Sequence, residues 1–474
     1  MFHCLRVKNP NAYWQAKRQL KIAAYTYWRT KRKKDRLTTR KREKILAKAK
    51  YVRFYNRRND SFRTGLLPLV LAYLKRKGIK FQIADRRHKA HCNNPAKLKK
   101  FHFKEPVEHR PEQIKTVQTA LSEKRGILAC TVNFGKTLTA AAIIAECSEK
   151  VRAIYIVHRI GLAQQTGDML RKLLPNRITV LGAGNKEFSG KGICVTTVQT
   201  AVHLLEESPE FRRFLEKTDV MFVDEIHVNS AAQVCKVSDE CAAPMRFGLS
   251  GTVDEKNKLK MMHYQGITGP VIARVKNIDL ISAGHSARPE IQFWEVRSVP
   301  IPRESGWGAA YLRGVVHCPE RNSLIVKRTL RAVAKDLTVM ISVSRISHGV
   351  ILKDLLQQAT EFKVEFLRGE TPVSVRQTVL QRFVKGKVPI LILSPIGDVG
   401  LDLPGGIGAW INAAGSKGYE LVLQRFGRAL RKNKYGNKVQ VVDFVDLHNP
   451  YLLKHSLARI GHYQREGFEV KFHE

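Results

Sequence analysis

The clearest pattern in the sequence is a series of short apolar segments that alternate with amphipathic stretches from Arg110 onward. The apolar segments comprise residues 153–157, 192–196, 220–223, 338–342 and 389–393. Strands that are apolar on both faces are typical of parallel sheets covered by helices on either side. The pattern therefore predicts an α/β fold with parallel-sheet domains in tandem. It weakens between Val253 and Gly308, where Gly and Pro increase, and we expect an interdomain region there.

The N-terminal region shows a different pattern. Residues 11–50 are rich in Lys, Arg, Ala, Leu and Gln and contain no Gly or Pro, which predicts a helix. Residues 51–55 and 80–84 predict strands, and a helix is expected between them from Pro68 to Lys77. This second stretch is therefore expected to form a small α/β domain.

These patterns predict five regions along the chain. They are a basic helical extension (1–50), a small α/β nucleic-acid-binding domain (51–105), two parallel-sheet domains (106–290 and 291–450) and a basic C-terminal helix and tail (451–474).

Positive charge is concentrated in the N-terminal regions. The 474-residue chain has 83 Lys and Arg against 41 Asp and Glu, a formal net charge of +42. Residues 1–110 hold 33 of these basic residues and 6 of the acidic ones. Such a field favours a polyanion, most commonly nucleic acid. Base stacking and packing on a helix face both stay open for the interleaved aromatic residues Tyr13, Trp14, Tyr25, Tyr27 and Trp28.

Several classes of protein are disfavoured. The longest apolar run, at residues 65–74, contains Pro68 and is far shorter than the roughly 18 residues of a membrane span. The N-terminus has no apolar core typical of a secretion signal. The eight cysteines include no Cys-x-x-Cys pair, which argues against a zinc ribbon or a disulfide scaffold. We therefore expect a cytoplasmic protein, in the host cytoplasm if a phage encodes it.

A phosphate-binding loop is expected at Gly135-Lys136-Thr137. An apolar strand precedes these residues and an Ala-rich helix follows them, which is the context that such a loop requires. Helix N-terminal amides would face the phosphates, Lys136 would reach the β- and γ-phosphates, and Thr137 would hold Mg²⁺. Cys130 stands where the usual pattern has its first Gly.

An acidic box follows the apolar segment 220–223. Asp224 and Glu225 stand at the end of this predicted strand, where ligands bind in open α/β sheets. Asp224 would bind Mg²⁺, and Glu225 would orient or deprotonate an attacking water. We expect His227 to connect the nucleotide with a neighbouring domain.

Together these motifs resemble those of superfamily 2 helicases and translocases of the Asp-Glu-x-His kind, and the resemblance spans roughly residues 106–448. It implies two RecA-like domains, ATP and Mg²⁺ as cofactors, and a motif that couples them at residues 250–252. It implies nucleotide contacts by Arg110, Gln113, Asn133, Gly135, His227, Gly400 and Asp402. It implies nucleic-acid contacts by His158, Arg159, Thr196, Thr197, Gln199, Ser344 and Arg345.

The segment 424–431 matches the last helicase motif, Q-x-x-G-R-x-x-R. The match implies catalytic roles for Gln424, Arg428 and Arg431, with both arginines acting as arginine fingers against the γ-phosphate. Arginine suits that role because it stays charged and offers several donors. The sequence departs from the family pattern at Cys130, at Asn133 and at 394–395, where Ser-Pro replaces a common Ala-Thr or Ser-Thr.

Residues 51–87 resemble the small N-terminal domain of phage UvsW-type helicases, on the stretches 52–55, 65–68 and 78–86. That resemblance implies branch migration of DNA at forks, Holliday junctions and displacement loops by an enzyme that we expect to be monomeric. Three alternatives stay open: an RNA helicase or remodeller with the same motor, a non-enzymatic annealing protein, and the motor part of a nuclease system. Because such motors contact mainly the backbone, the residues discriminate poorly between DNA and RNA.

Overall fold

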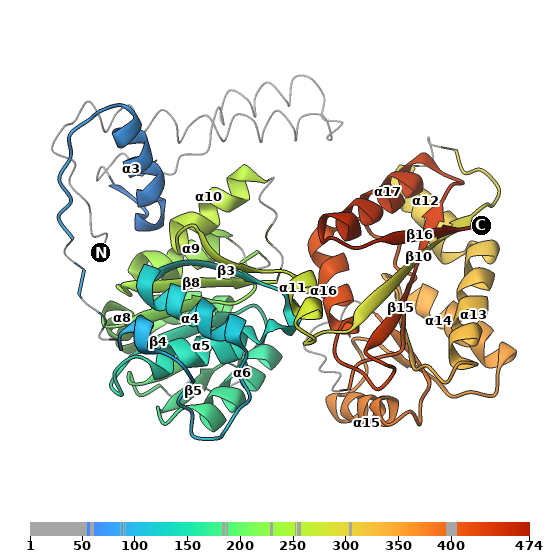
Figure 1. Cartoon of the computed structure of the whole chain (residues 1–474), viewed down its shortest axis with the longest axis horizontal. Coiled ribbons are helices and arrows are strands. Elements are labelled where there is room, and N and C mark those ends of the chain that lie inside the picture. The colour runs from blue at the N-terminus through green and yellow to red at the C-terminus, as the bar shows by residue number, and fades with distance from the viewer. Residues whose placement is uncertain are drawn as a thin grey trace. The chain divides into compact units, whose positions relative to one another are not determined.

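The computed structural model of the protein describes residues 55–56, 61–85, 87–88, 90, 92–182, 185, 188–227, 231–251, 253, 257–302, 306–394 and 405–474. They form two compact units, seen in Figure 1. The first comprises the chain up to Cys130 together with residues 135–274, and the second comprises residues 131–134 and 275–474. The expected helix at 11–50 lies outside the described residues.

The first unit is built on a seven-stranded sheet with the order β5-β6-β4-β7-β8-β3-β9. Strands β3 to β8 pair in parallel, as their apolar sequences predict. The strands are β3 (Arg125–Cys130), β4 (Ala153–Val157), β5 (Ile178–Leu181), β6 (Ile193–Thr197), β7 (Val220–Val223), β8 (Met245–Ser250) and β9 (Val271–Val275). The helices are α4 (Pro111–Glu123), α5 (Lys136–Ala145), α6 (Ile160–Leu173), α7 (Val198–Glu207), α8 (Pro209–Glu216), α9 (Ala231–Glu240) and α10 (Lys258–Ile267).

The second unit repeats this architecture, with the strand order β12-β13-β11-β14-β15-β10-β16 and every pair parallel. The strands are β10 (Arg288–Val296), β11 (Val339–Ser342), β12 (Val364–Leu367), β13 (Ile390–Leu393), β14 (Ala409–Asn412), β15 (Lys438–Asp446) and β16 (Val470–His473). The helices are α11 (Asn277–Ser282), α12 (Gly306–Tyr311), α13 (Pro319–Val333), α14 (Ile346–Ala359), α15 (Val373–Val384), α16 (Tyr419–Ala429) and α17 (Pro450–Arg465), with a π-helical turn at Leu312–Val316. Two parallel sheets in tandem confirm the predicted fold class.

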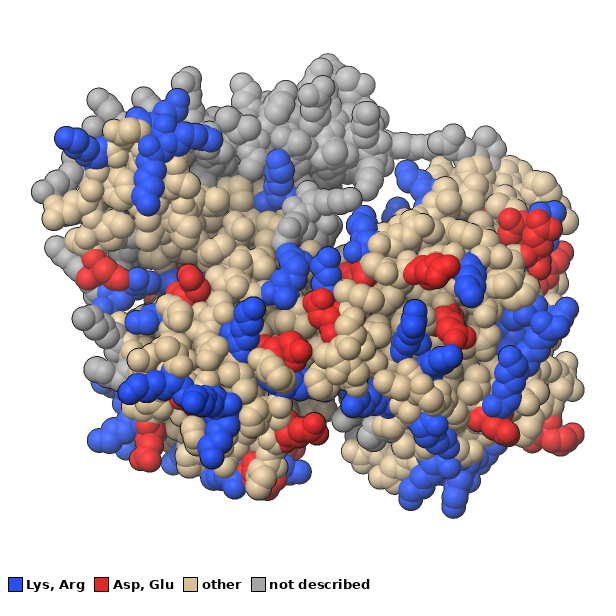
Figure 2. Space-filling model, viewed as in Figure 1, with Lys and Arg blue, Asp and Glu red and all other residues tan. Residues whose placement is uncertain are grey.

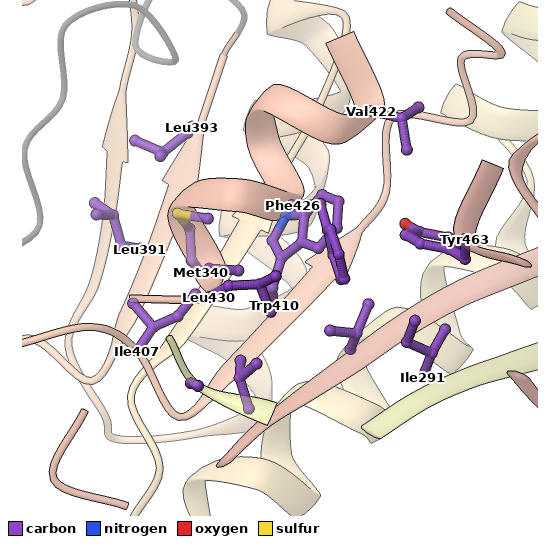
Figure 3. Packing of buried hydrophobic residues seen from close by; sticks show 14 of the residues in the cluster. Ile291, Met340, Leu391, Leu393, Ile407, Trp410, Val422, Phe426, Leu430 and Tyr463 are labelled. Atoms are coloured by element: carbon purple, nitrogen blue, oxygen red, sulfur yellow. The ribbon is translucent and has the colours of Figure 1, made fainter. Parts of the chain in front are cut away.

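The core of the second unit lies on both faces of its sheet. On one face, Trp410 of β14 packs against Phe426 of α16, and Tyr463 of α17 packs against the same phenylalanine (Figure 3). The indole of Trp410 donates a 3.0 Å hydrogen bond to the hydroxyl of Ser342, which satisfies its buried polar atom. A second cluster, which includes Ile341 and Phe444, covers the other face.

Two buried ion pairs fasten helices to β15. Arg459 of α17 donates to Asp443 at 3.0 Å, and Arg321 of α13 donates to Asp446 at 2.9 Å. All four side chains are almost completely buried. The expected C-terminal tail is thus part of the second unit, where β16 also pairs with β10.

The small N-terminal domain is described in part. A helix predicted from Pro68 to Lys77 is confirmed as α3 (Leu67–Arg76), and β1 (Tyr55–Asn56) pairs with β2 (Ser61–Phe62). The strand predicted at 80–84 is wrong, because these residues form no regular element. A bidentate ion pair of Arg63 with Asp239, at 2.7 Å, joins this part to α9. The short 3-10 turns are Thr64–Leu66, Pro95–Lys97 and Val132–Phe134.

The stretch expected to be an interdomain region carries regular structure. It contains α10, β9, α11 and β10, and the second compact unit begins at Val275 within it. Strand β9 is the edge strand of the first sheet and follows Gly269-Pro270, whereas β10 pairs with both β15 and β16 in the second sheet. Because β10 (RPEIQFWEV) contains several polar residues, the apolar alternation weakens here without interrupting the fold. Within the described part of the chain, no helix combines the length and apolar character that crossing a bilayer requires.

Candidate functional site

The carboxyl ends of the central strands bring the predicted motifs of the first unit together. The loop before α5 follows β3, His158 follows β4, and Asp224 follows β7. These strands lie in the order β4-β7-β8-β3, and parallel strands end at one edge of a sheet. The sheet topology therefore gathers segments that are up to about a hundred residues apart in sequence.

Gly135 sets the geometry of the loop. It is the N-cap of α5 and has a φ of +86°, a left-handed conformation that side chains other than Gly rarely adopt. A Cβ at this position would lie 2.8 Å from Nε2 of Gln113. The side-chain carbonyl of Gln113 accepts a 2.9 Å hydrogen bond from the backbone amide of Arg110, which forms a capping box at the start of α4. Gln113 thus lies directly beside the predicted phosphate-binding loop.

Lys136 and Glu225 form an ion pair. The ammonium Nζ lies 3.2 Å from Oε1 of Glu225, and both side chains are largely buried. Burial alone lowers the pKa of Lys136, but the carboxylates of Glu225 and Asp224 outweigh it and raise that pKa above its usual value. Lys136 is therefore cationic beside these two carboxylates.

The two carboxylates of the acidic box have different properties. Burial, together with the neighbouring Glu225, raises the pKa of Asp224 to about 7. Burial also opposes ionisation of Glu225, but Lys136 and His227 outweigh it and lower the pKa of Glu225. Glu225 has a φ of +42°, an uncommon conformation for a residue other than Gly that costs free energy. Its backbone amide donates to Asp224 at 2.9 Å.

His227 connects the acidic box to the end of β8. Its Nδ1 lies 2.8 Å from the hydroxyl of Ser250 and 3.4 Å from Oε2 of Glu225. Tyr264 of α10 donates from its hydroxyl to the His227 carbonyl at 3.3 Å. The imidazole thus joins the acidic box and the start of the 250–252 motif, whose last residue lies outside the described residues.

Tyr155 lies beside the predicted site and is not among the residues predicted from the sequence. It lies in the middle of β4, is fully buried, and packs its ring against Phe222 of β7 with centroids 5.6 Å apart. Its hydroxyl interacts with Thr137 and Asp224, and burial raises its pKa well above the usual value. The hydroxyl nevertheless has no hydrogen bond of good geometry. A buried donor of this kind, facing two predicted Mg²⁺ ligands, fits a site that is completed by a further ligand.

The oxygen donors of this site suit Mg²⁺. The hydroxyl of Thr137 and the carboxylate of Asp224 are hard ligands, and Mg²⁺ usually takes one or two of these together with phosphate and water. No cluster of three His, Cys, Asp or Glu side chains that could form a complete metal cage occurs among the described residues.

The predicted nucleic-acid contacts of the first unit differ in accessibility. Arg159, the N-cap of α6, and Gln199 of α7 are exposed, whereas His158 is half-buried and burial lowers its pKa. Thr197 caps α7 by accepting from the amide of Thr200. The Thr196 side chain is completely buried, and its hydroxyl donates to the Leu181 carbonyl at 3.4 Å.

The remaining predicted site residues belong to the second unit. Ser344 follows β11, and Arg345 is the exposed N-cap of α14. Arg428 lies in the last turn of α16, and burial lowers the pKa of Arg431 just beyond it. Asn133 lies in the segment 131–134 that groups with this unit, and its amide donates to the Gly427 carbonyl at 2.8 Å.

Three further predictions cannot be placed. Gly400 and Asp402 lie outside the described residues. Gln424 is part of α16, but its side chain is not among those described.

Comparison with known families gives two matches that follow the two units. Residues 104–255 match the family described as the res subunit of type III restriction enzymes, and residues 322–433 match the helicase conserved C-terminal domain. The DNA 3'-5' translocase XPB2 of Sulfurisphaera tokodaii is 25% identical over 366 residues, which cover 70% of this chain and 80% of that protein. The chain spans about half the length of two other XPB-type relatives that it matches.

Solved structures support the fold. S. cerevisiae Dbp5 bound to Gle1 and IP6 covers 77% of this chain and 88% of its own, with a TM-score of 0.53 and 14% identity. The structure of T4 UvsW covers 98% of this chain and 96% of its own, with a TM-score of 0.43 and 19% identity. The shared fold is the tandem RecA-like arrangement of two parallel sheets.

Proposed function

This chain belongs to superfamily 2 of the helicases, and from that premise we propose that it is an ATP-driven motor that remodels branched DNA. The observation that carries the ATPase part of the proposal is the ion pair of Lys136 with Glu225, which is largely buried and lies beside Asp224, with Thr137 next to Lys136 in the chain. Each of these four residues has the charge or donor that phosphate-anhydride hydrolysis requires.

The first proposed step is the exchange of partners by Lys136. Its ammonium pairs with Glu225 at 3.2 Å. A triphosphate at the N-terminus of α5 would compete for this ammonium, because the amides and the helix dipole also favour an anion there. Once Lys136 turns to the phosphates, Glu225 is free to accept the proton of the attacking water. ATP binding and activation of the base are thereby linked.

Thr137 and Asp224 would hold Mg²⁺, which neutralises the phosphate charge when bound. The role suits Asp224, since its negative charge is disfavoured by burial and by Glu225 in the absence of a cation. Gln113, beside Gly135, is proposed to contact the adenine. Arg428 and Arg431 are proposed as the residues that stabilise the charge that develops on the γ-phosphate.

DNA is the proposed track. XPB2 of S. tokodaii is named a DNA 3'-5' translocase, and the N-terminal sequence resembles UvsW-type enzymes of branched DNA. Lys and Arg side chains are spread over both units on the face in Figure 2, which favours a polyanionic partner. We propose that Arg159, Gln199, Ser344 and Arg345 contact the DNA backbone. The proposed context is replication, recombination and repair, for a phage-encoded enzyme that acts as a monomer.

The test is ATP hydrolysis by the full chain with no nucleic acid, single-stranded DNA, branched DNA or single-stranded RNA. The Lys136→Ala variant serves as the inactive control. Strong stimulation by branched DNA that this variant lacks is the expected result. Stimulation by RNA alone would overturn the DNA assignment, and hydrolysis by the variant at the parental rate would overturn the site.

A further inference from the structure

Trp307 is an exposed aromatic side chain on a well-packed base. It lies in α12 (Figure 1), and 41% of it is accessible to solvent. Its ring lies against the buried imidazole of His455 from α17, with centroids 4.1 Å apart, and against Tyr311 at 5.4 Å. The indole is thus packed against two rings on one side and exposed to solvent elsewhere. This arrangement suits an aromatic residue that stacks on a base better than it suits a core residue.

Tyr311 places α12 at the carboxyl edge of the second sheet. Its hydroxyl donates to the carbonyl of Ala414, just beyond β14, at 2.8 Å. The same hydroxyl interacts with the side chain of Ser344, just beyond β11. Strands β11 and β14 are parallel neighbours, so these two contacts fix α12 beside their carboxyl ends. Trp307 lies four residues before Tyr311 in α12 and packs against its ring, and Tyr311 in turn reaches Ser344, which is proposed above to contact nucleic acid.

Cations lie near the imidazole on which Trp307 packs. Lys417 and Lys454 are exposed and lie close enough to His455 to help burial lower its pKa to about 4. The imidazole beneath Trp307 is consequently neutral at pH 7. Asp443 and Asp446, the acidic side chains that α17 contacts, are buried in their ion pairs with arginine. An exposed aromatic ring among exposed cations complements a nucleic-acid strand, whose bases stack and whose phosphates are negative.

We propose that Trp307 stacks on a base of single-stranded DNA while Arg345, Lys417 and Lys454 bind the adjoining phosphates. A single strand fits better than a duplex, because the faces of paired bases are already covered by their neighbours. The inference rests on the proposed function, since it assumes that DNA is the track.

The test compares the affinity of the full-length protein for single-stranded and blunt duplex DNA. Trp307→Ala should weaken single-strand binding by about 10-fold, within the range that base–aromatic stacking supplies, and leave duplex binding unchanged. Trp307→Phe should retain most of the affinity. Phe362→Ala is the matched control, because Phe362 is 51% exposed but lies at the amino end of β12, whereas α12 lies at the carboxyl ends of β11 and β14. The Phe362→Ala variant should bind DNA as the parent does.

A second measurement changes the DNA and uses the same protein variants. Single abasic sites moved along the strand should reveal one position where loss of the base weakens binding by the parent and by Trp307→Phe, which keeps a ring to stack. The same abasic site should not weaken binding by Trp307→Ala any further. Lys454→Ala should lower the slope of log affinity against log salt by about 0.7, whereas Trp307→Ala should leave it unchanged.

The outcomes separate the two proposals. If the parent binds DNA and Trp307→Ala binds single-stranded DNA equally tightly, the proposed stacking role of Trp307 is wrong, and the proposed function is unaffected. A parent that binds neither single-stranded nor branched DNA would overturn the proposed function. A Trp307 effect confined to single-stranded RNA in a parallel titration would also contradict the inference.

Discussion

The ammonium of Lys136 and the carboxylate of Glu225 lie 3.2 Å apart, so the predicted phosphate ligand and the predicted general base neutralise each other. Neither group can act fully while this pair persists, because the lysine is turned from the phosphates and the base is held by a cation. The pair therefore makes the proposed hydrolysis dependent on prior binding of the triphosphate.

Glu225→Gln should separate binding from hydrolysis. The substitution removes the charge that holds Lys136, so we expect ATP to bind at least as tightly as it does to the parent. Hydrolysis should fall by at least about 100-fold, the lower range for loss of a general base. Binding of a fluorescent ATP analogue and single-turnover hydrolysis measure the two effects. Glu206→Gln, an exposed carboxylate on α7, is the control; a Glu225→Gln variant that hydrolyses ATP as fast as this control contradicts the assignment.

Asp224→Asn should stabilise the protein without ligands in a pH-dependent way. The pKa of Asp224 is raised to about 7, so the folded state binds its proton more tightly than the unfolded state, where the pKa is about 4. Parental stability therefore falls as pH rises from about 4 to 7, by about 1.4 kcal/mol for each pH unit that separates the folded and unfolded pKa values. The variant should escape this loss and exceed the parent most at pH 8.

Thermal unfolding across pH 5 to 8 measures this difference. Asp168→Asn removes an exposed carboxylate of α6 and is the control, for which we expect a nearly constant offset from the parent. If the stability difference between Asp224→Asn and the parent does not grow with pH, burial does not raise the pKa of Asp224.

Tyr155→Phe tests the residue that the sequence analysis missed. The phenyl ring keeps the packing on Phe222, and the substitution removes a buried hydroxyl that lacks a well-formed hydrogen bond. We expect the stability without ligands to stay equal or rise by up to about 1 kcal/mol. Affinity for ATP in the presence of Mg²⁺ should fall several-fold, because Thr137 and Asp224 lose the hydroxyl that faces them.

Titrations of a fluorescent ATP analogue with and without Mg²⁺ distinguish this role from simple packing. Tyr435→Phe is a matched control in the second unit, where the hydroxyl of Tyr435 contacts Thr338 at 3.2 Å. Identical Mg²⁺ dependence of nucleotide binding in Tyr155→Phe and the parent would rule the role out.

The site residues that could be predicted are those that adjacent residues in the sequence identify as part of a motif. Asp224-Glu225 follows an apolar strand directly, and Gly135-Lys136-Thr137 follows one after a four-residue loop, so the local sequence locates both beyond a strand end. The sheets were predictable for the same reason, since fully apolar strands have one main environment. Strand order was not predictable in this way, because it depends on contacts between distant segments.

Other features depend on those distant contacts. Tyr155 has the position of an ordinary core aromatic in its strand, and its proximity to Asp224 arises only because β4 and β7 are neighbours. Thr196 looks like a surface contact beside Thr197, but alternation along β6 directs its hydroxyl towards β5. Residues 80–84 alternate as a strand does, yet no described strand pairs with them. A hydrophobic pattern therefore predicts which side chains are buried, but it does not predict which other segments pack against them.

Arg459→Met should destabilise the second unit strongly. The guanidinium of Arg459 is the buried partner of Asp443, whose pKa is already raised by burial, and it also lies 3.9 Å from Asp446. Removing one partner of such a pair typically costs about 3–5 kcal/mol, because the other charge remains buried. The double variant Arg459→Met with Asp443→Asn should recover part of this loss, because it leaves no unpaired carboxylate on that strand position. Chemical denaturation of the parent, both single variants and the double variant gives the coupling free energy. A double variant that is no more stable than Arg459→Met would show that the arginine acts through its packing on α17 and not through its charge.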